Sequence, residues 1–150
     1  MNIIVTDGKD DRFHKLCDQL DEYLDNAVGI EKQRSQYVQY NHLDDIHDVV
    51  LVIENEEAVG CGSFKKYTDS TAEIKRIFVC KKCRGKKYGQ AIIRQLEKMA
   101  SDKGFKRLIL ETGISLVHAG IMYHNIGYHD IENYGQYKDM KDSICMEKNL

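Results

Sequence analysis

The hydrophobic pattern changes its period in the middle of the chain, and that change limits the folds available. Residues 73–80 alternate polar and apolar side chains, which predicts a β-strand. Over residues 92–100 apolar side chains recur at helical spacing, and Gly104 closes that helix. The intervening stretch contains Gly85 and Gly89 and is rich in Lys and Arg. The segment is therefore predicted to run from a strand through a basic glycine loop into a helix.

The same patterns along the rest of the chain predict one domain of mixed strands and helices. Further strands are predicted over residues 3–6, 49–54, 58–67, 107–112, 128–131 and 143–147, and further helices over 10–29, 30–41 and 115–126. Ser115 is expected to cap the last helix. No internal repeat or linker interrupts the 150 residues. This order predicts an α/β or α+β fold with helices on both faces of a mixed sheet.

Charge is divided unevenly along the chain, although the net charge is only −2. Residues 1–73 carry 7 Lys or Arg and 16 Asp or Glu, whereas residues 74–150 carry 15 and 8. Residues 75–107 concentrate the positive charge, with 12 Lys or Arg against 2 acidic residues. This asymmetry predicts an anionic ligand near the second half of the chain.

No sequence feature indicates a membrane span, a secretory leader or a disulfide framework. The longest aliphatic run, residues 49–53, is far shorter than the ~20 residues that cross a bilayer. The N-terminus has no basic start followed by a long apolar stretch, so we expect a cytoplasmic location. The five cysteines are an odd number, and we expect them to be reduced thiols.

The loop between the central strand and helix has the features of a phosphate site. The first N–H groups of a helix have no partner within it, and the helix dipole adds partial positive charge there. Gly85 and Gly89 allow the backbone to approach a ligand, and the neighbouring Lys and Arg supply counter-charge. The segment therefore predicts a pyrophosphate site, although it matches neither of the two commonest nucleotide-loop patterns.

Three motifs in the second half of the chain resemble the GNAT superfamily of N-acetyltransferases. Residues 84–89 (RGKKYG) resemble its acetyl-CoA loop, Arg/Gln-x-x-Gly-x-Gly/Ala. Residues 72–79 look like the strand that leads to that loop, and residues 110–113 look like the end of the next strand. Residues 119–128 are similar to the family's A-x-x-L-Y-x-x-x-G-Y/F helix and turn. The element order also fits, and the resemblance covers residues 48–150 well.

The resemblance implies a fold and a cofactor. The fold is a mixed, mostly antiparallel central sheet of six to seven strands with about four helices on both faces, in one domain over residues 1–150. The donor is acetyl-CoA, and no metal is implied. The pantetheine arm is expected to pair with backbone groups of Ile77, Phe78 and Val79 as if it were an added strand. The expected loop contacts are Arg84, Gly85, Lys86, Lys87, Tyr88, Gly89 and Gln90.

The resemblance also implies a base and an acid for acetyl transfer. An alkylammonium with a pKa near ~10 has to lose a proton before it attacks. Glu73 stands where the family often has a carboxylate base, acting directly or through water, and Glu111 is the alternative base. Tyr123 matches the tyrosine that protonates the departing thiolate. The implied reaction is direct attack in a ternary complex, with no covalent enzyme intermediate.

The chain departs from the family pattern in two places. Lys87 stands where the first glycine of the loop motif is usual, so one approach of the backbone to the ligand is more crowded. Leu116 and Val117 lie where many members have an Asn and a neighbouring Pro or Glu. An Asn contact to the cofactor therefore does not carry over to this chain.

The sequence does not identify the acceptor of the acetyl group. We expect a primary amine of a small molecule, and the alternatives are a peptide or protein amine, or a non-catalytic acyl-CoA-binding sensor. Nucleic acid is disfavoured because Tyr88 is the one aromatic residue among the loop cations and the first half is acidic. The Cys80-x-x-Cys83 pair lacks the second ligand pair of a structural zinc site. No membrane partner is expected, and a homodimer stays open.

Overall fold

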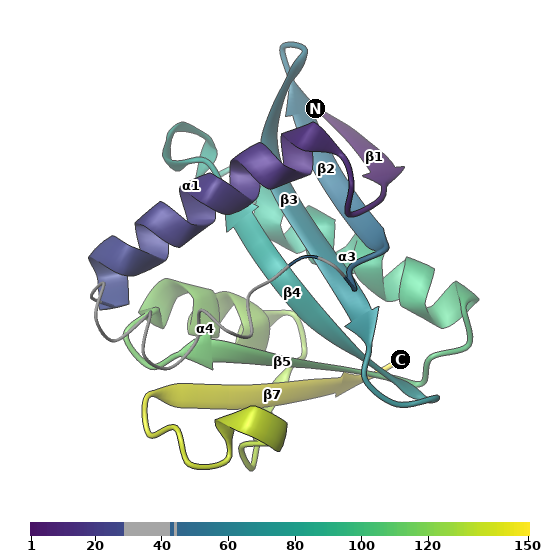
Figure 1. Ribbon diagram of the computed structural model, residues 1–150, viewed down its shortest axis with the longest axis vertical. Helices are drawn as coiled ribbons and strands as arrows, with labels where there is room; N and C mark the ends of the chain where they lie inside the picture. Colours follow the sequence, from purple (N-terminus) through teal and green to yellow (C-terminus); the bar gives the residue numbers. More distant parts are fainter. Residues whose placement is uncertain (29–42, 44) are drawn as a thin grey trace.

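A computed structural model describes residues 1–28, 43 and 45–150, and in it seven strands form one mixed sheet (Figure 1). The strands are β1 (Asn2–Thr6), β2 (Asp48–Glu54), β3 (Glu57–Lys66), β4 (Thr71–Val79), β5 (Arg107–Gly113), β6 (His129–Ile131) and β7 (Ser143–Asn149). The α-helices are α1 (Asp11–Val28), α3 (Tyr88–Asp102) and α4 (Val117–Asn125). Short 3-10 turns cover Lys81–Cys83 (η2) and Gly135–Tyr137 (η3).

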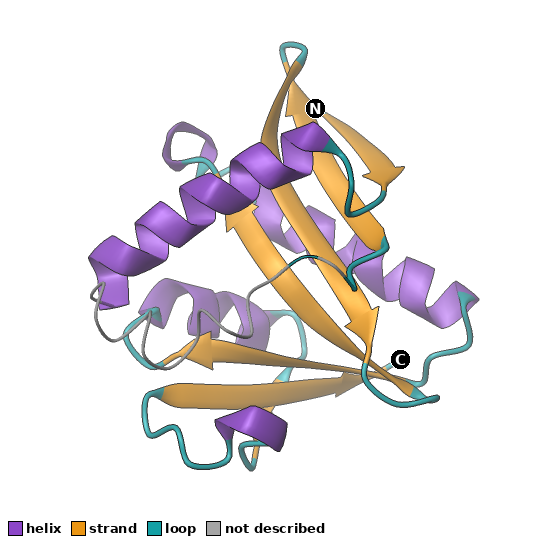
Figure 2. Cartoon of the chain, in the orientation of Figure 1, coloured by secondary structure: helices purple, strands orange, loops and turns teal. Residues whose placement is uncertain are grey.

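Helices cover both faces of the sheet, because the central strands carry apolar side chains on both faces and each apolar face has to be buried. Successive residues of a strand point to opposite faces of the sheet. A strand such as β2, which is apolar on both faces, therefore contributes side chains to two hydrophobic cores. Val49 and Leu51 pack with Phe13 of α1 on one face. Val50 and Val52 pack with the apolar residues of α3 on the other. Figure 2 shows α1 and α3 on opposite sides of the strands, which confirms the predicted layering.

Most predicted elements are present within a residue or two of their expected bounds. The hairpin turn between β2 and β3 falls at Asn55 and Glu56, which have φ of 51° and 66°. One boundary was wrong: α4 begins at Val117 rather than after Ser115, with Leu116 at its N-cap and no side-chain cap. The helix predicted over residues 30–41 lies outside the described residues. Within the described part of the chain, none of the helices has the length and apolar character needed to cross a membrane.

The strand order β1-β2-β3-β4-β5-β7-β6 contains one parallel pair, and that pair separates early. β4 and β5 pair only from Thr71 to Glu73 on one strand and from Arg107 to Ile109 on the other. Beyond these positions the two strands diverge, as Figure 1 shows between the labels β4 and β5. The remainder of β4 keeps antiparallel partners in β3. Its other edge therefore opens into the space between the two strands.

β4 is also irregular where it leaves β5. Its register with β3 shifts between Cys61 and Ser63, so that Cys61 faces Phe78 and Ser63 faces Lys75. β4 thus holds one extra residue, and Arg76 within this bulge has a φ of 62°. A bulge bends a strand and increases its twist. We attribute the separation of β4 from β5 to this bend.

The close contact between β3 and α3 at Gly62 gives a stability prediction. A Cβ atom at Gly62 would lie 2.4 Å from Ile92 Cγ2 and 2.6 Å from Ile77 Cδ1. Gly62→Ala should therefore lower the free energy of unfolding by about 1–3 kcal/mol, the usual range for overpacking a core. Urea denaturation monitored by circular dichroism measures this change.

Gly120 supplies the matched control because it lies within α4 and a Cβ there would meet nothing within 4 Å. Gly120→Ala should leave stability unchanged or raise it by up to about 1 kcal/mol, since Ala is the better helix former. Equal stability of the two Ala variants would contradict the close packing of β3 on α3.

Candidate active site

A cleft of about 1020 Å³ opens where β4 and β5 separate. It is lined by the second half of α1, by β4, by the basic loop and the start of α3, and by β5 and α4. This volume is at the upper end of the range of small-molecule sites. The cleft brings together the following predicted site residues: Glu73, Ile77, Phe78, Val79, Arg84, Gly85, Lys87, Tyr88, Gly89, Gln90 and Tyr123. Lys86 is not among the lining residues.

The basic loop and the start of α3 form the phosphate end of the cleft. Gly85 has a φ of 84°, which glycine adopts without strain. α3 then begins at Tyr88, and its first N–H groups have no partners within the helix. A Cβ at Gly89 would lie 3.0 Å from Met122 Sδ, so this glycine allows α3 to approach α4. These features fit the phosphates of a CoA, because they combine backbone donors with a helix N-terminus.

Lys87 has a strained backbone. It is the N-cap of α3 and has a φ of 64° and a ψ of 23°, in the left-handed region. This conformation costs an L-residue roughly 1–2 kcal/mol, whereas glycine adopts it freely. The geometry therefore explains why a glycine is usual at this position of the motif, and Lys87 holds the same turn at an energetic cost.

Two loop cations are held by other parts of the protein. Lys86 Nζ lies 3.2 Å from both carboxylate oxygens of Glu54, at the end of β2. The Tyr88 hydroxyl donates a short hydrogen bond to the same carboxylate. Arg84 lies with its guanidinium carbon 4.6 Å from the centre of the Tyr23 ring of α1. Its Nε donates to the Val79 carbonyl at 3.0 Å, so α1, β4 and the loop are joined at one point.

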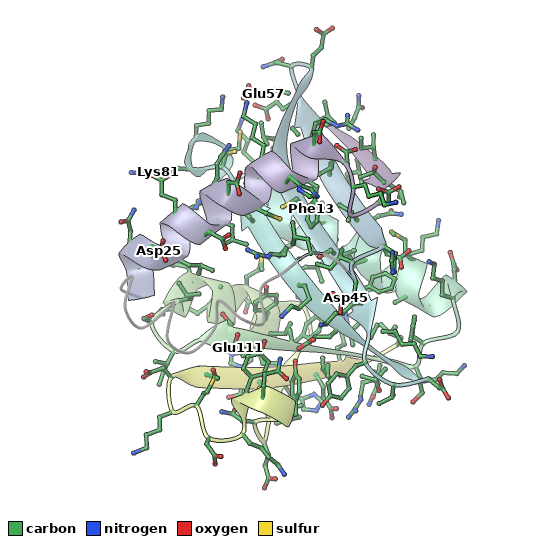
Figure 3. The ribbon with its side chains drawn as sticks, viewed as in Figure 1. Phe13, Asp25, Asp45, Glu57, Lys81 and Glu111 are labelled. Carbon is green, nitrogen blue, oxygen red and sulfur yellow. The ribbon has the colours of Figure 1, made fainter. Side chains whose placement is uncertain are left out.

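Another part of the cleft contains two carboxylates, of which Glu73 is buried and Glu111 is half-buried. Glu73 is 2% exposed, and its Oε2 accepts a hydrogen bond of 2.6 Å from the Tyr134 hydroxyl. Glu111 Oε2 accepts one of 2.6 Å from the Ser143 hydroxyl, and Figure 3 shows Glu111 on β5 beside β7. Burial raises the pKa of Glu111, and the neighbouring Glu73 raises it further, while Ser143 and Lys75 act in the opposite direction. Both candidate bases are thus present at one end of the cleft.

Lys75 follows Glu73 by two residues on β4, next to the strand β5 that carries Glu111. It is 9% exposed and shares its side of β4 with Glu73, two residues away. Its Nζ donates to the Tyr137 hydroxyl at 3.3 Å. Burial lowers the pKa of Lys75, although Glu73 and Glu111 act in the opposite direction.

Tyr123 projects from α4 toward the same cleft. It is 7% exposed, and its ring packs edge-on against the Tyr128 ring at 5.9 Å between centroids. Burial raises the pKa of Tyr123, and the nearby charge of Glu111 raises it further. Over residues 1–28, 43 and 45–150, no hydrogen-bond partner of its hydroxyl is recorded. The phenol is therefore a protonated donor that faces the cleft.

The cysteines do not form a metal or disulfide site in the described residues. All five are free thiols. Cys80 donates to Gln19 Oε1 at 3.4 Å, and Cys83 to Glu54 Oε1 at 3.8 Å. In the part of the chain that the structure describes, no group of three or more His, Cys, Asp or Glu is arranged to hold a metal ion.

The sequence alone did not predict the contacts that three further residues make at the site. Tyr134 holds the carboxylate of Glu73 from 61 positions away, and no local pattern marks that contact. Glu54 engages the basic loop across 32 and 34 positions. Lys75 was visible in the pattern, because it alternates with Glu73 on a strand that leads to the loop. The signal in the sequence was that a charged residue lies on the same side of the strand as the proposed base.

The comparisons with known proteins agree with this geometry. The sequence profile of the acetyltransferase (GNAT) family matches residues 13–128. The chain is 30% identical over 144 residues to the IAA acetyltransferase of Azospirillum brasilense, an alignment that covers 91% of this chain and 89% of that protein. It is 26% identical over 127 residues to the N-acetyltransferase YsnE of Bacillus subtilis (strain 168), covering 83% and 78%.

Solved structures share the fold over nearly the whole length. A structure described as an acyl-CoA N-acyltransferase from Klebsiella pneumoniae has a TM-score of 0.79 and 26% identity, with 99% of this chain and 97% of that chain covered. The PaiA N-acetyltransferase from Thermoplasma acidophilum in complex with coenzyme A has a TM-score of 0.75 and 18% identity, with 100% of both chains covered.

Family membership follows from the profile match together with the fold. The chain belongs to the acetyltransferase (GNAT) family and is an acetyl-CoA-dependent N-acetyltransferase. Its mixed, mostly antiparallel seven-stranded sheet is the fold that the resemblance implied.

The strain at Lys87 predicts a stabilising substitution. Lys87→Gly should raise the free energy of unfolding by about 0.5–1 kcal/mol, since relief of the left-handed conformation exceeds the entropy that glycine loses on folding. Lys87→Ala removes the same charge and keeps the strain, so this control should show no gain. Thermal denaturation of both variants measures the difference, and equal melting temperatures would contradict the assignment of strain.

The burial of Glu111 predicts a pH dependence of stability. Because its pKa is raised in the folded state, folding favours the protonated form, and the wild type loses stability as pH rises above the ordinary value of 4.5. Glu111→Gln removes this titration. The difference in the free energy of unfolding, variant minus wild type, should therefore increase as pH rises from about 4.5 to the folded pKa. The increase should be about 1.4 kcal/mol for each pH unit between the two pKa values.

Urea denaturation at a series of pH values measures this gap. Glu132→Gln, in which the lost carboxylate is exposed, controls for the removal of one negative charge. A gap between Glu111→Gln and the wild type that stays constant with pH would contradict the raised pKa.

Proposed function

We propose that this enzyme transfers an acetyl group from acetyl-CoA to a primary amine of a small molecule, by direct attack in a ternary complex. One observation carries the proposal: a buried carboxylate on β4, a buried phenol on α4 and the basic loop before α3 line a single cleft. A donor held by the loop and an acceptor held beside the carboxylate have access to one another there, and no nucleophile of the protein has to intervene.

The donor's place follows from the backbone. The loop and the N-terminus of α3 hold the phosphates through N–H groups, with Arg84 and Lys87 adding charge. The pantetheine arm lies along the edge of Ile77, Phe78 and Val79, which β5 leaves unpaired. This arrangement points the thioester toward the end of the cleft that contains the carboxylates.

Glu73 acts as the general base, directly or through one water. It takes the proton of the ammonium, and the free amine nitrogen then attacks the thioester carbonyl carbon. A backbone N–H near Val79 stabilises the oxyanion that forms. The C–N bond is made, the C–S bond breaks and the thiolate of CoA leaves, and the second proton of the attacking nitrogen passes to solvent, which gives the neutral amide.

Tyr123 acts as the general acid that protonates this thiolate. Burial keeps the phenol protonated until the transfer. The same burial raises the proton affinity of a thiolate in the cleft, because a low dielectric disfavours any anion. The proton therefore moves from the phenol as the negative charge develops on sulfur, and solvent restores it when the products leave.

The small size of the acceptor is supported by the enclosed position of the base. Glu73 is almost fully buried, so the acceptor nitrogen has to enter the cleft to meet it. A relative that shares 30% identity with this chain is named for acetyl transfer to IAA, and this name supports a small-molecule acceptor. We therefore rank a peptide or protein amine as the second candidate for the acceptor.

Removal of the acid or the base provides the test. Tyr123→Phe should lower kcat by about 10²–10⁴-fold, which is the usual contribution of a positioned acid or base. Binding of CoA, measured by isothermal titration calorimetry, should stay within about twofold of wild type, since the ring remains. Glu73→Gln should give a loss of the same order, and release of free thiol measures both rates.

Glu111→Gln is the matched control for the base, because it removes the second carboxylate from the same end of the cleft. A larger loss in Glu111→Gln than in Glu73→Gln would transfer the role of base to Glu111. No acetylation by the wild type across a broad panel of amines would overturn the proposed function.

A further inference from the structure

We propose that the acceptor is an amino acid or a similar small amino carboxylate, and that Lys75 binds its carboxylate while Glu73 receives its amine. This inference rests on the proposed amine acetylation and names its substrate class. It assigns to the cleft a carboxylate subsite formed around one buried ammonium group.

Lys75 has unused hydrogen-bonding capacity in a buried place. An ammonium carries three donors, and the recorded contact of Nζ is one long hydrogen bond of 3.3 Å to the Tyr137 hydroxyl. The side chain is more than nine-tenths buried and lines the cleft. Among the described residues no ion pair of Lys75 is recorded. A buried cation of this kind is costly unless a ligand neutralises it.

The nearby carboxylates of Glu73 and Glu111 act on the charge of Lys75, but among the described residues neither forms an ion pair with it, and each accepts a hydrogen bond from another group. Tyr134 donates to Glu73 and Ser143 donates to Glu111, each at 2.6 Å. Both donors come from the segment between β6 and the start of β7, and both are neutral hydroxyls. The segment thus holds the two acids in place and leaves the ammonium of Lys75 facing the cleft.

The spacing of the two charges fits one small ligand. Glu73 and Lys75 lie on the same side of β4, and two residues of a strand span about 6.6 Å. A ligand with an ammonium and a carboxylate separated by a short carbon bridge places each charge against its opposite. Such a zwitterion adds no net charge to the cleft, whereas a simple amine supplies no carboxylate to form an ion pair with Lys75.

Matched pairs of acceptors test the carboxylate directly. The pairs are phenylalanine with phenethylamine, tryptophan with tryptamine, histidine with histamine, and lysine with cadaverine. Each pair differs by the carboxylate alone, so the preferred side chain does not have to be known. For every accepted pair, the wild type should show a kcat/KM at least about tenfold higher for the amino acid, which corresponds to one charged hydrogen bond.

A variant of the lysine identifies the residue responsible. Lys75→Met keeps the length of the side chain and removes the charge. It should raise KM for the amino acid and lower the ratio of kcat/KM for the amino acid to kcat/KM for its decarboxylated amine by about ten- to hundredfold. Lys66→Met, on the exposed end of β3, is the matched control and should change neither substrate. CoA binding by calorimetry shows that each variant is folded.

Calorimetric titration of the amino acids into the wild type saturated with CoA separates this inference from the proposed function. Binding that is lost in Lys75→Met supports the carboxylate subsite even if no acetylation occurs, and in that case the proposed function fails alone. Equal use of both members of a pair by the wild type overturns the subsite and leaves the proposed function standing. If the wild type neither acetylates nor binds any of the probes, both the carboxylate subsite and the proposed function are overturned.

Discussion

The short pairing of β4 with β5 is the constraint on which the site depends. A sheet normally satisfies the backbone groups of an inner strand on both edges, because an unpaired buried N–H or C=O costs free energy. Here the bulge at Arg76 bends β4 away after three paired positions, so one edge of β4 is left for a ligand. The same bend creates the cleft, directs the strand into the basic loop and brings α4 across the opening. One irregularity therefore creates the free edge of β4 to which we assign the donor, and the proposed acceptor site begins where the pairing ends.

Contacts with α1 hold the bend in place. The Arg76 guanidinium lies 2.6 Å from Asp21 of that helix. Two further contacts, of Cys80 with Gln19 and of Arg84 with Tyr23, join α1 to the end of β4 and to the loop. The buried apolar face of α1, with Phe13 and Leu16 at its centre, anchors the helix on the sheet. The helix thus joins the bulged part of β4 to the basic loop.

The secondary structure of this domain could be predicted from its sequence because the hydrophobic periods are regular and glycines mark the ends. The start of α4 was the exception, since Ser115 is a good N-cap by residue type but the helix begins after Leu116. The bulge in β4 was not predicted: the consecutive polar residues Lys75 and Arg76 interrupt the alternation of the strand, but such an interruption does not by itself distinguish a bulge from regular strand. The bulge is visible only once the register with β3 is known.

Only those residues of the candidate site that belong to a local sequence motif could be predicted. The loop, Glu73 and Tyr123 lie in motifs that can be recognised along the chain, and the structure brings them to one cleft. The contacts of Tyr134 with Glu73 and of Lys86 with Glu54 each join a loop residue to a residue of a strand far away in the sequence, so they depend on the tertiary fold rather than on local sequence. The conformation of Lys87 was also hidden, because a lysine gives no sign of a left-handed turn.

The charge asymmetry of the sequence has a different physical meaning in the folded chain. Several cations of residues 75–107 form ion pairs with acids of residues 1–73: Arg76 with Asp21, Lys82 with Glu57, Lys86 with Glu54 and Lys103 with Asp48. These pairs join the two halves of the domain and reduce the charge that remains for a ligand. In the proposed donor site, anion binding therefore depends mainly on the backbone donors of α3 and on Lys87, which lines the cleft. A lysine at the motif's glycine position thus has two opposing effects, since it strains the turn and places a cation beside the proposed phosphate site.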